Sequence, residues 1–169
     1  MAHFYESLPA DITALTDRQA MERFVAGAEA PRRAIAGLSS VLLNSVPVPG
    51  AWSIQQIVLH LMDTDLIAAY RMKRIIAEDR PKLELYDENA FAQHLYYERM
   101  DAKVACEIFR GNRLLMGRLL TALPDEAFLR TALHPEMGEM SLSRFVRLYV
   151  KHLEHHMSFV TRKLERLNV

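Results

Sequence analysis

The sequence predicts an all-α fold: a four-helix up-down-type bundle with a short extra helical segment between the second and third helices. Apolar residues recur at three- and four-residue intervals through most of the 169 residues, whereas alternating Val/Ile/Thr-rich runs between tight turns are almost absent. Four long helical stretches joined by connections of roughly ten to twenty residues favour a bundle, and no solenoid repeat is present. The length suits one domain over residues 1–169.

The first helix is expected to begin with Asp17 as its cap and to run through Phe24. Pro31 fits the first turn of its continuation or restart, which extends to about Leu38. The segment Pro47–Gly50 is a rigid break in the chain.

The second long helix is predicted from a capping-box pattern, Ser53 with Gln56, and it should end near Asp79. Asp87 is expected to cap the short extra segment, which reaches His94.

Asp101 is expected to cap the third long helix, which ends before Pro124. Its apolar spacing runs through Val104, Ile108, Leu115 and Leu119. The stretch 125–140 predicts a loop, and Ser141 is expected to cap a last helix from Leu142 to about Leu167.

The balance of charge disfavours polyanionic partners. Lys+Arg and Asp+Glu both number 21, so no net field steers the chain toward nucleic acid or an anionic membrane. Arg144, Arg147 and Lys151 on the last helix predict a solvated face rather than a nucleic-acid surface. Cys106, the one cysteine, excludes an internal disulfide and is expected to be a small core residue. We expect a cytoplasmic protein, since neither a secretion signal nor a membrane span is evident.

His152 and His156 lie one helical turn apart in the last helix and predict half of a metal site. On a helical wheel His156 falls within the apolar face and His152 on its edge, whereas His155 points off the face and Glu154 lies nearly opposite. Leu153 follows His152, so the chain lacks the glutamate of the His-Glu-x-x-His zinc proteases.

His60 lies beside Thr64 at the flank of the buried stripe of the second helix, where it could supply a third ligand. A lone histidine on an apolar face is more often a hydrogen-bonded core residue, so the prediction depends on the three imidazoles meeting. If they do, a metal keeps an open coordination position, as catalytic metals do. Asp63 is interpreted as helix surface or as an acceptor that orients the His60 ring.

Two motifs extend the pattern. The second helix carries Trp52-Ser-Ile-x-x-Ile-Val-Leu-His60-Leu-Met-Asp63-x-Asp65, and the last carries Ser141-Leu-x-x-Phe-x-x-x-Tyr149-x-x-His152-x-x-His155-His156. With Pro47–Gly50 and His134–Gly138, they resemble the DinB/YfiT-like superfamily of four-helix bundle proteins. The resemblance implies a divalent metal, zinc or nickel, held by His60, His152 and His156, and it also implies a homodimer.

The activity that this resemblance implies is not unique. Some relatives are transferases or isomerases that use low-molecular-weight thiols such as mycothiol, bacillithiol or glutathione, and others are described as metal-dependent hydrolases. We expect a metal-dependent enzyme of the thiol-transferase or isomerase type, acting on a small molecule through a metal-activated thiolate or water. The alternatives are a hydrolase and a noncatalytic bundle that binds a small ligand or a protein.

Four further side chains have open roles. Tyr149 is either a core residue or a hydrogen-bond donor near the metal. His94, Tyr96 and Tyr97 either overhang the pocket or are ordinary loop residues.

Overall fold

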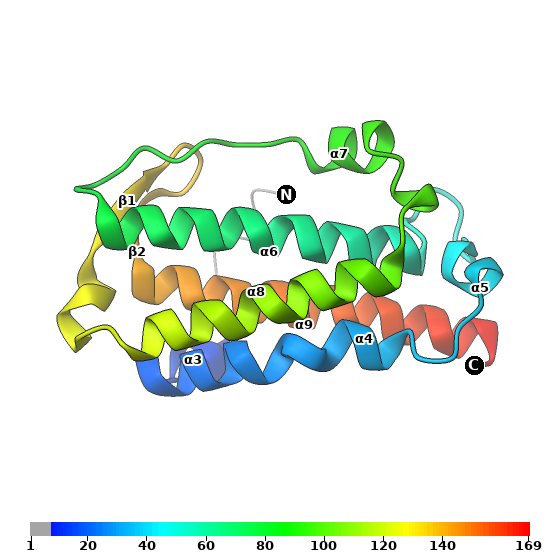
Figure 1. Ribbon diagram of the computed structural model, residues 1–169, viewed down its shortest axis with the longest axis horizontal. Coiled ribbons are helices and arrows are strands. Elements are labelled where there is room, and N and C mark those ends of the chain that lie inside the picture. Colours follow the sequence, from blue (N-terminus) through cyan, green and yellow to red (C-terminus); the bar gives the residue numbers. More distant parts are fainter. Residues whose placement is uncertain (1–7) are drawn as a thin grey trace.

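The computed structural model describes residues 8–169 and confirms the predicted helical bundle. After a short α2 (Ala10–Thr13), four long helical rods lie side by side (Figure 1). The first rod combines α3 (Asp17–Ala26), a 3₁₀ turn (Gly27–Glu29) and α4 (Ala30–Ala34), and the others are α6 (Ile54–Ala77), α8 (Ala102–Thr121) and α9 (Leu142–Leu167). Within residues 8–169, no helix has the length and apolarity that crossing a membrane requires.

The bundle is as predicted, but the directions of its rods depart from the strict alternation of an up-down bundle (Figure 1). In Figure 1 the first rod and α9 run one way, and α6 and α8 run the other way. Because α6 and α8 are parallel, residues 78–101 return along the length of the bundle before α8 begins. This crossing segment carries α7 (Glu88–His94), the predicted extra helix, and a 3₁₀ turn (Tyr97–Arg99).

A β-hairpin lies at one end of the bundle, where the prediction of a loop over 125–140 was wrong. A 3₁₀ turn (Asp125–Leu129) leads into β1 (Thr131–His134), which pairs antiparallel with β2 (Gly138–Ser141). Strands of four residues are too short to show a clear alternating pattern. The Leu83 amide donates to the Leu133 carbonyl over 2.9 Å, so the hairpin also fixes the crossing segment. A short α5 (Ser40–Asn44), which the sequence did not indicate, lies at the opposite end (Figure 1).

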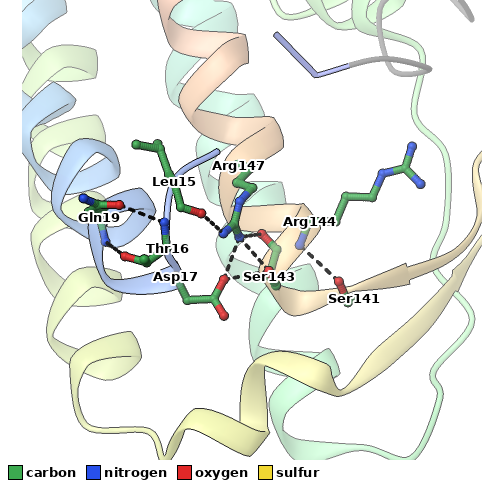
Figure 2. Close-up of polar contacts among 8 residues, drawn as sticks. All are labelled: Leu15, Thr16, Asp17, Gln19, Ser141, Ser143, Arg144 and Arg147. Carbon is green, nitrogen blue, oxygen red and sulfur yellow. Dashed lines mark hydrogen bonds and ion pairs between the residues drawn. The ribbon is translucent and has the colours of Figure 1, made fainter. Parts of the chain in front are cut away.

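Thr16, not Asp17, caps the first helix. Its hydroxyl accepts from the Gln19 amide over 3.2 Å, and the Gln19 side chain accepts from the Thr16 amide over 2.9 Å (Figure 2). The Asp17 carboxylate instead accepts from Ser143 and Arg147 of α9, each over 2.6 Å. The acid at this helix start therefore joins the first rod to the last one.

The other predicted caps are confirmed. At the start of each of four further helices a side chain accepts hydrogen bonds from backbone amides. These caps are Ser53 for α6, Asp87 for α7, Asp101 for α8 and Ser141 for α9. The second long helix ends at Ala77, close to the predicted Asp79.

A buried ion pair joins the four rods. The Asp65 and Arg113 side chains, 2% and 1% exposed, are 2.9 Å apart. Arg113 also donates to the carbonyls of Phe24 and Tyr149, each over 3.0 Å, and Asn112 donates to the Asp65 carboxylate. One guanidinium thus contacts backbone or side chains of the first rod, α6 and α9 from its position on α8.

The apolar spacing noted in α8 lies largely on the outer side of the bundle. Val104, Ile108 and Leu115 are 54%, 42% and 61% exposed. The buried side of α8 is formed by a different set, among them Ala105, Cys106, Phe109, Met116 and Leu120. Cys106 is a core residue, as predicted, and burial raises the pKa of its thiol to about 12.

Candidate metal centre

The three predicted histidines meet inside the bundle. His60 of α6 and His152 and His156 of α9 each offer a ring nitrogen, and these nitrogens lie within 4.8 Å of one another. The Nε2 atoms of His60 and His152 are 3.3 Å apart, and the His156 ring centroid lies 4.7 Å and 4.5 Å from theirs. His60 and His152 are 1% and 4% exposed, and His156 is half-buried.

The surroundings orient His60 from two sides. The Trp52 ring, just before the helix cap, lies 4.9 Å from the His60 ring, centroid to centroid. Thr64, one turn further along α6, places its hydroxyl 3.3 Å from His60 Nδ1 and 2.6 Å from the Tyr86 hydroxyl. The sequence placed Thr64 beside His60 but did not indicate Tyr86, which comes from the crossing segment.

Asp63 does not orient the His60 ring. Its carboxylate accepts a hydrogen bond from the Tyr97 hydroxyl over 2.5 Å, and the hydroxyl near the His60 ring is that of Thr64. The suggestion of Asp63 as the orienting acceptor was therefore wrong.

The environment keeps the three imidazoles neutral. Burial lowers the pKa of His60 to about 4 and that of His156 to about 3, and the neighbouring imidazoles contribute to the shift at His156. Burial, followed by the other histidines, also holds the pKa of His152 well below its usual value. Neutral imidazole is the form that binds metal ions.

The donor set fits one cation. Two nitrogens bound at about 2.05 Å with a tetrahedral angle between them lie about 3.3 Å apart, which matches the separation of the His60 and His152 Nε2 atoms. The buried Nδ1 of His156 has no hydrogen-bond partner among residues 8–169. Such a group costs about 1–3 kcal/mol when it is left unsatisfied, so a metal ion bound through this nitrogen would remove that cost. Three ligands leave a tetrahedral ion one position for another molecule.

No glutamate beside the pair serves as a base in the manner of the zinc proteases, as the sequence predicted. Glu154 lies on the other side of α9, where its carboxylate accepts from Arg23 of α3 over 2.7 Å. His155 is exposed.

Of two cavities in this part of the bundle, one includes a residue of the cluster in its lining. The first, of about 260 Å³, contains none of the three histidines but is lined by Thr64 and Tyr86, which lie beside His60, and by three carboxylates, Asp87, Glu88 and Glu136. The second, of about 350 Å³, has His156 in its lining and apolar walls. Those walls are Val48, Trp52, Ile57 and Phe159. The cluster therefore borders, through His156, one cavity of the size that small ligands occupy.

The four side chains whose roles were left open occupy different environments. Tyr149 is a core residue, 5% exposed, with its ring 5.9 Å from that of His152. His94 and Tyr96 are exposed and line neither cavity. Tyr97 is buried and donates to Asp63, so none of the three overhangs the cavities.

The fold and this site define a class: helical bundles with a three-histidine cluster that can hold a metal ion. The model of the DinB superfamily matches residues 23–160. This chain belongs to the DinB superfamily.

Similar proteins agree with this assignment. A protein of Oceanobacillus iheyensis named "Putative metal-dependent hydrolase" is 27% identical over 135 residues, which cover 80% of this chain and 78% of that protein. One of Bacillus mycoides with the same description is 29% identical over 136 residues, with the same coverage. The solved structure of YfiT from Bacillus subtilis, described as a probable metal-dependent hydrolase with an unusual four-helix bundle topology, matches with a TM-score of 0.85. It is 22% identical and covers 96% of this chain and 91% of its own.

Proposed function

We propose that the protein is a metal-dependent enzyme that acts on a small molecule, with His60, His152 and His156 as the ligands of a zinc or nickel ion. The convergence of three neutral, buried ring nitrogens from α6 and α9 carries this proposal. A divalent ion held there lowers the pKa of a bound thiol or water and so supplies a nucleophile near neutral pH.

The favoured reaction is transfer of a low-molecular-weight thiol to an electrophilic small molecule. Water needs a base to take its proton during attack, and Glu154, the carboxylate nearest in sequence to the histidine pair, is held by Arg23 away from the cluster. A thiol is far more acidic than water and needs less help. The chain's own contribution is to orient His60 through Thr64 and to exclude bulk water around buried imidazoles.

Hydrolysis is the second candidate, and the names of the similar proteins favour it. In a hydrolytic reaction the nucleophile would be water, and the carbon attacked would belong to a carbonyl or amide-like group. The Tyr86 and Thr64 hydroxyls, 2.6 Å apart beside His60, could then relay a proton, and the cavity that both line also contains three carboxylates that could accept it, Asp87, Glu88 and Glu136.

A pair of variants on one helix tests the site. His156→Ala should remove the bound metal and all turnover, because two imidazoles bind a divalent ion much more weakly than three. His155→Ala, the exposed neighbour on α9, is the matched control and should retain both. The measurements are elemental analysis of protein purified without a His tag and release or consumption of thiol, with glutathione, bacillithiol and mycothiol against a panel of electrophiles.

A panel of activated esters and amides, assayed without thiol, separates the two reactions. Thiol-dependent turnover supports transfer, and thiol-independent turnover supports hydrolysis. Stoichiometric metal with no turnover in either panel would leave the noncatalytic alternative and reject the enzyme.

A further inference from the structure

The second cavity carries charge of one sign. Beyond its apolar walls and His156, its lining includes three cations from the end of α9, Arg162, Lys163 and Arg166, and no carboxylate. The chain as a whole is neutral, with 21 basic and 21 acidic residues. A purely positive lining is therefore a local property of this cavity.

These cations have no counter-charge within residues 8–169. None of the ion pairs between described residues includes Arg162, Lys163 or Arg166. Lys163 is only 7% exposed as a residue, although its amine is not among the fully buried polar atoms that lack a partner. Burial, followed by the charge of Arg166, lowers the pKa of this amine. Buried charges are ordinarily paired.

The helix end alone does not account for the arrangement. Cations in the last turn interact favourably with the helix dipole, and an exposed Arg166 satisfies that preference. The dipole gives no reason for burying Lys163 against a cavity. Arg162 is also positioned, since its guanidinium lies over the Phe159 ring of the wall, 4.8 Å from the centroid.

We propose that this cavity binds the carboxylate of a small amphipathic molecule, with Lys163 as the central contact and Arg162 and Arg166 beside it. The apolar body of the ligand lies against Trp52 and Phe159, and its reactive end reaches His156. The inference rests on the proposed function in placing the reactive end at the metal, and it names the class of molecule that the site takes.

Binding by the metal-loaded full-length protein tests the proposal. 4-Phenylbutyrate should bind at least about tenfold more tightly than the neutral 4-phenylbutan-1-ol, because a hydrogen bond to a charged group contributes that much or more. Lys163→Met, of similar size, should abolish the difference, and Lys163→Arg should restore it. Lys73→Met, an exposed lysine of α6, is the matched control and should bind as wild type does. Isothermal titration calorimetry gives the affinities.

Two results would overturn the proposal. One is equal affinity for acid and alcohol. The other is an acid preference that survives in Lys163→Met, which would assign carboxylate binding to the metal or to the two arginines and not to Lys163.

Competition by S-methylglutathione identifies the source of the carboxylate. Displacement of 4-phenylbutyrate would assign the cavity to a thiol co-substrate, and binding of 4-phenylbutyrate without displacement would assign it to the other substrate. Both assignments require that the protein bind 4-phenylbutyrate more tightly than the alcohol, and that this difference depend on Lys163. These binding measurements can fail separately from the activity assays. If the protein prefers the acid through Lys163 but shows no turnover, only the proposed function is rejected. If it shows turnover but no preference for the acid, only the carboxylate-binding role of this cavity is rejected.

Discussion

A buried ion pair and its hydrogen bonds connect the helices of this bundle. Arg113 reaches Asp65, Phe24 and Tyr149, and it is one of the largest fully buried side chains. A buried ion pair adds little net stability over apolar residues of similar size, but removal of one partner leaves an uncompensated charge.

Arg113→Met should therefore lower the free energy of unfolding by about 3–5 kcal/mol. The double variant Asp65→Leu/Arg113→Met should recover much of that loss. Urea unfolding followed by circular dichroism measures both. Arg80→Met, which breaks the exposed pair with Glu139, is the control and should change stability little. A double variant less stable than Arg113→Met would contradict this account of the pair.

At the scale of residues, the sequence predicted the three histidines because spacing on a helix is a local property. Thr64 was visible beside His60 for the same reason. Tyr86 was not, since its contact with Thr64 depends on the path of residues 78–101. The role of Asp63 stayed open between helix surface and an orienting acceptor, because a carboxylate one turn from His60 does not show which tertiary partner it will meet, here Tyr97.

At the scale of elements, the helix contacts depend on where the glycines of α8 lie. A Cβ atom built on Gly117 would lie 2.3 Å from Val25 Cγ2, whereas one built on Gly111 would meet nothing within 4 Å. The first glycine permits the approach of α3, and the second only loosens the helix.

The two glycines should respond oppositely to the same change. Gly117→Ala should destabilise the protein by about 1–3 kcal/mol through overpacking. Gly111→Ala should stabilise it by up to about 1 kcal/mol, because alanine has the higher helix propensity. Thermal and urea unfolding of the pair gives the comparison, and shifts of the same sign would show that α3 and α8 do not pack as described.

Helix starts were predictable because a cap and its amide partner lie within three residues of each other. Ser53 with Gln56 and Ser141 with Arg144 are examples. The hairpin was not predictable from pattern, since each strand has four residues. In α8, apolar residues lie on both faces, so the sequence does not show which face is buried. The packing of the neighbouring helices determines it.

At the scale of the whole molecule, buried histidines link stability to pH. His60, His134, His152 and His156 all have lowered pKa values, with burial as the largest cause. The unfolded chain, with histidine pKa values near 6.5, takes up protons first as the pH falls.

The metal-free protein should therefore lose stability as the pH drops from about 6.5 toward 5, by up to about 1.4 kcal/mol per pH unit for each such histidine. Urea unfolding at pH 7, 6 and 5 in the presence of a chelator measures the slope. His156→Ala should reduce the slope, and the exposed His94→Ala should not. Stability that is unchanged over this interval would contradict the neutral, buried state of the cluster.

The parallel direction of α6 and α8 could not be predicted from the sequence. A connection as long as residues 78–101 can lead either to an antiparallel or to a parallel neighbour, and apolar spacing is the same in both cases. The bundle itself was predictable because it follows from helix length and amphipathicity alone.

The histidines of the cluster come from distant parts of the chain, with 92 residues from His60 to His152, and this separation sets when the cluster can form during synthesis. At elongation rates of about 5–20 residues per second, the first imidazole leaves the ribosome several seconds before the other two are synthesised. Assembly of the cluster is consequently a late event of synthesis, and a nascent chain arrested before α9 would contain His60 without its two partner imidazoles.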